Sequence, residues 1–341
     1  MPPYGSMPMM PMFMPPRPGG AGKWITIILL LILLLGSGAL NLLLLVGVVV
    51  GDGPDHLRQT ILKKGNASQQ VAVLPLSGLI MDDEAKRFAK LLDRMSEMSA
   101  VKAIVVEIDT PGGSVTASDE IYHRLQSFKA ARGIPVVISQ GALATSGGYY
   151  VSCAGDFIFA QPTTLTGNIG VMMPRYNLSK LADKWGIEDT SMHSTGSEFK
   201  TAGSLLRPET PKEREYMQGL IDAAFACFRE VVEDNRKAVK FKDVATAKVY
   251  PAKEAERLHL VDAIGYLDNA CAKAEKLAGL TGAQVVRYQP TSSLLDLLTV
   301  SSGAGDAHAK DITVNGVNIQ LDRRALEALA TPRLMYLSTG Q

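Results

Sequence analysis

The segment from Trp24 to Val50 constrains the fold of this chain most, because it contains no charged residue and consists mainly of leucine, isoleucine and valine. As a helix rising about 1.5 Å per residue it would be about 40 Å long, which exceeds the roughly 30 Å hydrocarbon core of a bilayer. Buried helices of soluble domains rarely run this far without a charge. The sequence therefore predicts one transmembrane helix over residues 24–50.

Charged residues on the two sides of this segment predict its orientation. Arg17 and Lys23 lie before it, whereas Asp52 and Asp55 follow it. The positive-inside rule then leaves the N-terminus in the cytoplasm and carries the following residues across the membrane, into the periplasm or the extracellular space. Basic residues between positions 58 and 64 weaken this bias.

A cleavable signal peptide is the alternative to a permanent anchor. The small residues Ser37, Gly38 and Ala39 follow an apolar stretch of suitable length, so a signal peptidase could cut after Ala39. The apolar run nevertheless continues from Leu40 to Val50. This continuation favours an uncleaved, single-pass signal-anchor.

Composition divides the rest of the chain into four parts. Residues 1–23 are rich in proline, methionine and glycine and cannot bury a core, so we expect a disordered tail there. Residues 51–70 are polar and contain several glycines, which indicates a linker. A globular domain is expected over residues 71–290, and a flexible C-terminal region over residues 291–341.

Charge and cysteine content argue against several classes of function. The formal net charge of +1 gives no reason to expect a nucleic acid as partner. The 3 cysteines lie far apart, so they form neither a disulfide framework nor a zinc site, and we expect no metal and no cofactor. Cys153 and Cys227 lie in apolar helical patterns, which predicts buried thiols.

Buried strands and amphipathic helices alternate along the first part of the domain. The run Ala103–Val106 is apolar at every position, as in a parallel sheet covered on both faces. The expected strands are 71–76, 101–108, 134–138 and 157–160, and the expected helices are 83–98, 114–131 and 145–154. This alternation predicts an α/β fold with a parallel sheet.

A later helix has a clear start, since Thr210, Pro211 and Glu213 form a capping box with proline at the first helical position. Its expected apolar face comprises Met217, Leu220, Ile221, Ala224, Phe225 and Phe228.

Two glycine-containing turns, Asp109–Ser114 and Gly141–Tyr150, each follow a buried strand and precede a helix. Ligands of open parallel sheets gather where strands end and helices begin, and glycines let backbone N–H groups approach them closely. Ser146, in the second turn, could be a nucleophile with two amides beside it. A simple helix N-cap is the alternative. Ala144 takes the place of the first glycine of a lipase elbow, and no Walker A loop is present.

The general base is less evident from the residues alone. None of the 5 histidines lies in a motif, which leaves a Ser-His-Asp triad open but unsupported. A lysine is the other option, although with an ordinary pKa of about 10.4 it must be partly desolvated to act near neutral pH, and burial can lower a lysine pKa by about 3–5 units. Lys200, beside Phe199 and small residues, is a candidate.

Four motifs in order resemble the signal peptide peptidase A family, in its short form with a single catalytic repeat. They are Thr110-Pro111-Gly112-Gly113-Ser114, Ala144-Thr145-Ser146-Gly147-Gly148-Tyr149-Tyr150, Leu165-Thr166-Gly167-Asn168-Ile169-Gly170-Val171 and Phe199-Lys200-Thr201-Ala202-Gly203. The resemblance covers roughly residues 71–288. It implies a Clp/crotonase-like domain of ββα repeats with a parallel sheet, preceded by the transmembrane helix.

The resemblance also implies roles for individual residues. Ser146 would attack the peptide carbonyl, and a neutral Lys200 would take its proton and pass one to the leaving amine. The N–H of Gly147 and one from Gly112 or Gly113 would form the oxyanion hole. Asn168 departs from a serine that is frequent in the family, and its amide could orient the lysine instead.

Assembly and substrate are implied in the same way. The family places its active sites at subunit contacts of a homo-oligomer, so Lys200 could serve the Ser146 of a neighbouring copy. Substrates would be remnant signal peptides or other apolar segments. Three alternatives stay open: a Ser-Lys peptidase of stomatin-like partner proteins, an inactive peptide-binding scaffold, and an acyl-CoA enzyme on the crotonase fold.

Overall fold

The computed structural model describes residues 21–51, 57–290, 310–314, 317–321 and 334–338. Most of the tail expected over residues 1–23 and part of the expected C-terminal region lie outside these ranges. The described residues fall into two units, the N-terminal helix and the domain that begins at Leu57.

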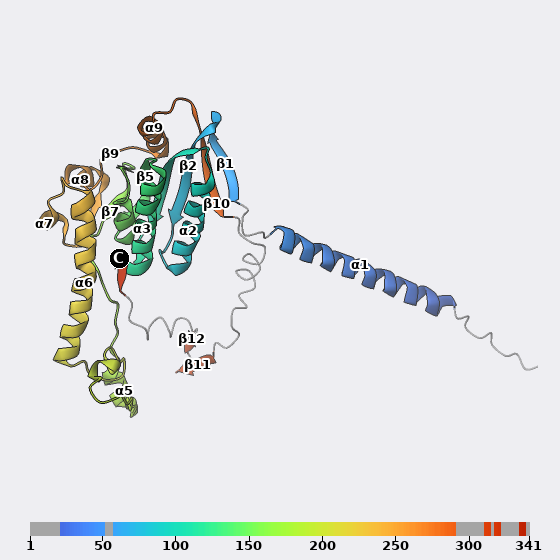
Figure 1. The fold of residues 1–341 in the computed structure, drawn as a ribbon. Coiled ribbons are helices and arrows are strands. Elements are labelled where there is room, and N and C mark those ends of the chain that lie inside the picture. The colour runs from blue at the N-terminus through green and yellow to red at the C-terminus, as the bar shows by residue number, and fades with distance from the viewer. Residues whose placement is uncertain (1–20, 52–56, 291–309, 315–316, 322–333, 339–341) are drawn as a thin grey trace, which may run out of the picture. The chain divides into compact units, whose positions relative to one another are not determined.

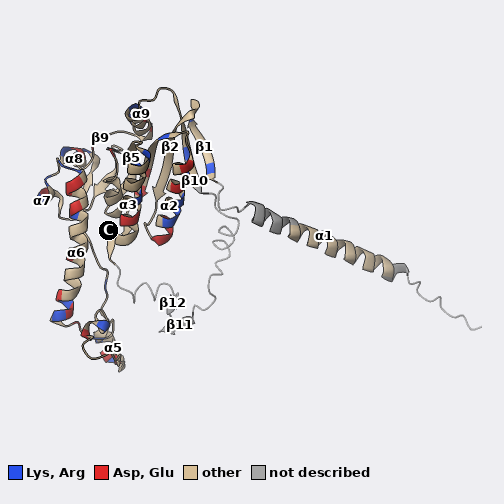
Figure 2. Cartoon of the chain, in the orientation of Figure 1, with Lys and Arg blue, Asp and Glu red and all other residues tan. Residues whose placement is uncertain are grey.

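Helix α1 (Ala21–Gly51) covers the segment expected to span a membrane. Its stretch Trp24–Leu42 has a mean hydropathy of 2.5, and none of that stretch is buried. Figure 2 shows the described part of α1 without a charged side chain. By length and composition, this helix is suited to cross a bilayer.

A 9-stranded, mostly parallel sheet forms the centre of the domain (Figure 1). Its main strands, in spatial order, are β1 (Leu57–Lys63), β10 (Ala283–Pro290), β2 (Asn66–Ser77), β3 (Val101–Thr110), β5 (Val136–Thr145), β6 (Phe157–Ala160) and β9 (Ala263–Ile264). Strand β7 (Leu165–Gly167) pairs in parallel with the end of β5, and β8 (Val249–Pro251) pairs antiparallel with β7. The expected α/β architecture is confirmed.

Each central strand buries both of its faces, as its continuous apolar run predicted. Val71 and Val73 belong to one core cluster, whereas Ala72 and Leu74 belong to the other. Helices α2 (Asp82–Glu97) and α3 (Val115–Arg132) cover one face of the sheet. Helix α9 (Leu267–Leu277) covers the opposite face (Figure 1).

The segment expected to be a linker contains β1 and the start of β2. Strand β1 pairs antiparallel with β10, which lies more than two hundred positions later in the sequence. Because β1 is an edge strand and is exposed along nearly its whole length, its sequence lacks the apolar alternation of a half-buried strand. The linker expectation therefore differs from the structure over residues 57–70.

The expected strand 134–138 is longer in the structure, and the expected helix 145–154 is shorter. Strand β5 runs to Thr145 because its second half pairs with β7. Helix α4 then spans only Gly147–Ser152. The connection is thus a single residue, Ser146.

Helix α6 (Pro211–Asn235) begins with the expected capping box, in which Thr210 and Glu213 bond each other's backbone N–H groups. Met217, Ala224 and Phe228 are buried as expected, but Leu220 is exposed, so the apolar face is narrower than the sequence indicated. Cys153 is buried, whereas the prediction for Cys227 is wrong, because its thiol lies on the exposed side of α6.

Shorter elements complete the described domain. They are β4 (Gly112–Ser114), α5 (Ser179–Trp185), the 3₁₀-helix η1 (Glu198–Thr201), α7 (Phe241–Val244), α8 (Ala252–Arg257), the β11 (Lys310–Val314) and β12 (Val317–Leu321) ladder, and β13 (Met335–Leu337). Within the region expected to be flexible, β13 pairs antiparallel with β4, and Tyr336 is fully buried.

Candidate active site

Ser146 occupies a sharp turn between β5 and α4. Its backbone has φ 55° and ψ −114°, a conformation that non-glycine residues rarely adopt. Its N–H donates to the carbonyl of Gly167 at 2.7 Å, and its carbonyl accepts from Tyr150 N–H at 2.9 Å. Pairing at both ends of the turn holds Ser146 in this conformation, and such strain collects at functional sites.

The Ser146 hydroxyl is buried, with the whole residue 1% exposed. Its Oγ has no hydrogen-bond partner among the residues that the structure describes. Buried hydroxyls are nearly always paired, so an unpaired one at a strained position indicates a functional group rather than a helix cap. The structure gives no side-chain capping bond at Ser146 either.

Three glycines surround this serine. Gly112 has φ 101°, and a Cβ built there would lie 2.8 Å from the N of Gly147 and 3.1 Å from the Cβ of Ser146. A Cβ built on Gly147 would lie 3.2 Å from the N of Gly113. The two glycine turns are therefore in contact, and the amides of Gly113 and Gly147 lie beside the candidate nucleophile.

Thr110 holds the first glycine turn in place. Its Oγ1 accepts from Gly112 N–H at 3.0 Å and donates to the carbonyl of Gly78. The N–H of Ile80 also donates to the Gly112 carbonyl at 2.9 Å. The role of Thr110 depends on the distant residues 78–80, so its motif alone does not reveal it.

Two tyrosines anchor the helix that follows Ser146. Tyr149 Oη donates to the Leu260 carbonyl at 3.0 Å, and Tyr150 Oη donates to Asp119 Oδ1 at 2.7 Å. Burial and the Asp119 carboxylate raise the pKa of Tyr150, so this hydroxyl stays a donor. These bonds fix α4, and with it the position of Ser146.

Asn168 follows β7 directly and has φ 55°. Its Nδ2 donates to the Ala247 carbonyl at 2.6 Å, and its N–H donates to the Lys248 carbonyl at 2.8 Å. The side-chain oxygen accepts no hydrogen bond from a described residue. The preceding residue, Gly167, accepts the backbone N–H of Ser146, so β7 brings the backbone next to Asn168 up to the serine turn.

Lys200 lies on η1, within a projecting segment of residues 175–210 that we call the arm. The arm is found at the end of α6 that points away from the sheet (Figure 1). Lys200 is exposed, and Ser146 Oγ has no hydrogen-bond partner among the described residues, so the two side chains are not bonded to each other. One chain therefore does not bring the two residues of the expected dyad together.

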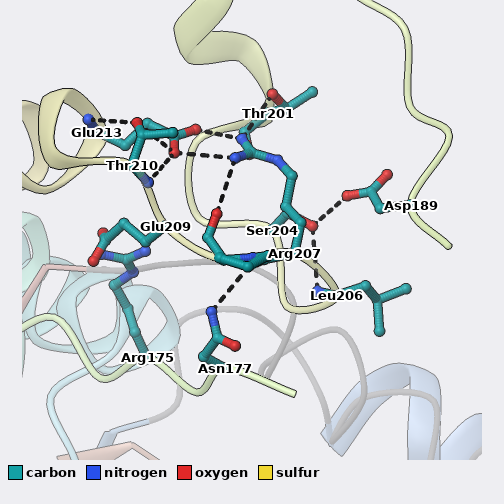
Figure 3. A network of polar contacts seen from close by, with 11 residues as sticks. Arg175, Asn177, Asp189, Thr201, Ser204, Leu206, Arg207, Glu209, Thr210 and Glu213 are labelled. Atoms are coloured by element: carbon teal, nitrogen blue, oxygen red, sulfur yellow. Dashed lines mark hydrogen bonds and ion pairs between the residues drawn. The ribbon is translucent and has the colours of Figure 1, made fainter. Parts of the chain in front are cut away.

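A polar network fixes the part of the arm that carries Lys200 (Figure 3). Arg207 Nη2 donates to the Thr201 carbonyl at 2.7 Å and to its Oγ1 at 2.9 Å. The same guanidinium pairs with Glu213, which also bonds Thr210. Arg207 lowers the pKa of Glu213 to about 2. Arg207 thus ties the residue next to Lys200 to the start of α6.

Among the described residues, no group of three or more histidine, cysteine, aspartate or glutamate side chains is arranged to hold a metal ion.

Comparison with known proteins places the chain in a family. Residues 129–281 match the model of peptidase family S49, and residues 63–164 match the model of the Clp protease family. A putative protease of Synechocystis is 32% identical over 219 residues, covering 64% of this chain and 77% of that protein. The chain belongs to peptidase family S49, the signal peptide peptidase A family of serine peptidases, and has the expected Clp-like fold.

Other relatives carry similar names. A putative protease of Methanocaldococcus jannaschii is 31% identical over 60% of this chain and 65% of its own length. Protease 4 of Salmonella typhi is 32% identical over 67% of this chain, which spans only 38% of that longer protein. A solved structure of the 1510-N membrane-bound stomatin-specific protease is 19% identical, with a TM-score of 0.44, and the match covers 69% of this chain and 100% of that one.

Proposed function

We propose that this chain is a membrane-anchored serine endopeptidase that cleaves apolar peptide segments, such as remnant signal peptides, with a Ser146–Lys200 dyad. One observation carries the proposal. The buried, unpartnered Ser146 Oγ stands at a strained turn against the amides of Gly113 and Gly147. Family membership supports the class of reaction.

The reaction follows from these groups. Ser146 Oγ attacks the substrate carbonyl carbon while its proton passes to the neutral amine of Lys200. The negative charge that develops on the carbonyl oxygen is met by the N–H groups of Gly113 and Gly147, with Gly112 leaving room for it. The lysine then protonates the leaving amine, and water releases the acyl group from Ser146.

We place Lys200 in the active site of a neighbouring copy of the chain. Within one chain it stays apart from Ser146, and the arm exposes an unusual amount of apolar surface for a monomer. The exposed large side chains of the arm are Tyr176, Leu178, Leu181, Trp185, Ile187, Met192, Phe199 and Leu206. Packing this surface against a neighbour would remove water from the lysine and favour its neutral form. Asn168 would then accept a hydrogen bond from it.

The dyad is tested by hydrolysis of an apolar peptide ester with the full chain in detergent. Ser146→Ala and Lys200→Ala should each lower the rate by at least about 10³-fold, as removal of a nucleophile or base does. Lys180→Ala, a change of an exposed lysine elsewhere on the arm, is the matched control and should leave the rate unchanged. Retained activity in either dyad variant would refute the assignment, and inactive wild type would favour a peptide-binding scaffold.

Mixing the two inactive variants tests the shared site. Co-assembled Ser146→Ala and Lys200→Ala chains should recover activity, because some sites then combine an intact serine with an intact lysine from the neighbour. A dyad within one chain predicts no recovery at any mixing ratio.

A further inference from the structure

Arg236 is the C-cap of α6, and its side chain is only 10% exposed. Its Nη1 and Nη2 each donate to one carboxylate oxygen of Asp262, at 2.9 and 2.8 Å. Its Nε and Nη2 also donate to the His259 carbonyl, at 3.2 and 2.8 Å. A planar guanidinium can make such a bidentate pair and bind a carbonyl at the same time, whereas a lysine ammonium has no planar fork. Arg236 therefore holds residues 259–262 at two points.

The segment 259–262 is also bonded to the sheet. Asp262 N–H donates to the Ile158 carbonyl of β6 at 2.9 Å, and Asp262 Oδ2 accepts the Ile158 N–H at 2.7 Å. His259, at the other end of the segment, has φ 60°, a conformation that non-glycine residues rarely adopt. Because Arg236 binds the carbonyl of this strained residue and the carboxylate that bonds β6, it sets the course of the chain between them.

This segment carries the acceptor that anchors the serine turn. Tyr149 Oη donates to the Leu260 carbonyl at 3.0 Å, and Tyr149 is fully buried. Burial raises the pKa of Tyr149 well above its ordinary value, so its hydroxyl stays a donor. Tyr149 belongs to α4, the short helix that begins directly after Ser146. Hydrogen bonds thus lead from Arg236 through residues 259–262 to the helix that holds the candidate nucleophile.

We propose that Arg236 is a positioning residue for the reaction, which sets the place of Ser146 through the Leu260 carbonyl and Tyr149. The inference rests on the proposed function and adds to it a residue that touches neither the substrate nor the reacting atoms. Ser146 depends on such support because its backbone is strained and its Oγ has no hydrogen-bond partner among the described residues. A misplacement of about 1 Å at a reacting group can lower a rate about 100-fold.

Arg236→Lys tests the proposal in the full chain, because it keeps the positive charge beside Asp262 but removes the fork. In peptide ester hydrolysis its kcat should fall about 10- to 100-fold with KM within about 2-fold of wild type, since the serine is misplaced and the substrate contacts are not. Tyr149→Phe keeps the buried ring and removes only the bond to Leu260, so it should lower kcat by about 3- to 10-fold.

The double variant Arg236→Lys/Tyr149→Phe separates positioning from general support of the fold. If the arginine acts through this tyrosine, the double variant should lose no more kcat than Arg236→Lys alone. A loss equal to the product of the two single losses would overturn the proposal, and so would a normal kcat in Arg236→Lys.

Arg132→Lys is the matched control. The Arg132 guanidinium also donates to backbone carbonyls, those of Met95, Met98 and Val101, at 2.9, 3.2 and 3.1 Å, where α2 ends. This variant should lower Tm but leave kcat normal, and together with Tyr149→Phe it should show only the loss of Tyr149→Phe. Equal kcat losses in Arg132→Lys and Arg236→Lys would show a general effect on the fold and refute the positioning role.

Hydrogen exchange of α4 gives a measurement that needs no turnover. At constant pH, the protection factors of residues 147–153 should fall in Arg236→Lys and stay at the wild-type level in Arg132→Lys. A wild-type chain that hydrolyses nothing would count against the peptidase, and these protection factors would still decide whether Arg236 holds α4. Unchanged protection in Arg236→Lys would refute the positioning role, whether or not the wild-type chain is active.

Discussion

At the scale of single residues, the site depends on two backbone positions with positive φ, Ser146 and Gly112. Ser146 accepts a strained φ because β5 and α4 are each held by their own hydrogen bonds. Gly112 leaves open the space where a carbonyl oxygen stands, here that of Tyr336. A Cβ atom at position 112 would fill this space, so the serine needs a glycine there as well as its own hydroxyl.

Gly112→Ala should lower kcat by about 10²–10³-fold, because the new Cβ would occupy the place of the oxyanion. The rate of peptide ester hydrolysis measures this effect. Gly133→Ala is the matched control, since Gly133 also has a positive φ but nothing lies within 4 Å of its Cβ position. That control should lose about 1–2 kcal/mol of stability with normal kcat. Equal kcat in the two variants would contradict the oxyanion assignment.

At the scale of elements, the arm is fixed by the start of α6. The Arg207 guanidinium links η1 to the capping box of that helix through Thr201 and Glu213. Arg207 acts here as a positioning residue, since it touches the residue beside Lys200 and not the reacting atoms. A planar guanidinium can make these bonds together, which a lysine ammonium does less well.

Acid should loosen the arm through Glu213. Its pKa is lowered from 4.5 to about 2, so its stabilising contribution is complete above pH 4.5 and disappears as the pH falls towards 2. The hydrogen-exchange protection factors of residues 198–207, which correct for the intrinsic pH dependence of exchange, should therefore fall across that window in wild type. Glu213→Gln should have lower protection factors at neutral pH, and these should no longer change across the window.

Glu215→Gln is the control for this titration, because Glu215 is exposed on the same helix and makes no ion pair with a described residue. Its protection factors should follow those of wild type at every pH. The same response in both variants would show that the ion pair with Arg207 does not hold the arm.

At the scale of the whole molecule, the long apolar helix α1 precedes the peptidase domain and is suited by length and composition to cross a bilayer. Its exposed leucines would face water in a soluble protein, which is costly over such a length. A bilayer removes that cost.

Leu33→Arg should reduce insertion, since an arginine near the centre of a span costs about 2.5–3.5 kcal/mol. The measured quantity is the fraction of the full chain that stays with membranes after alkaline extraction. Leu277→Arg, at an exposed position at the end of α9, should remain with the membranes like wild type. Identical extraction of wild type and Leu33→Arg would argue against an anchor.

Local sequence patterns were enough to predict the features that depend on residues close together in the chain. The uncharged run at α1, the apolar runs of β2 and β3, the spacing of Phe88 and Leu91 on α2 and the capping box of α6 all depend on contacts of short range or on a simple period. The motifs around Ser146 and Lys200 pointed to the family before any geometry.

Only the tertiary structure decided what distant segments do together. Strand β1 has no apolar alternation and becomes a strand through β10, and β13 gains its place from β4 and Met172. Likewise, the contact of Gly112 with Gly147 follows from the pairing of neighbouring strands, and the separation of Lys200 from Ser146 follows from the place of the arm at the end of α6. Such pairings depend on the shape and hydrogen-bonding edges of the folded domain, which no local period of the sequence encodes.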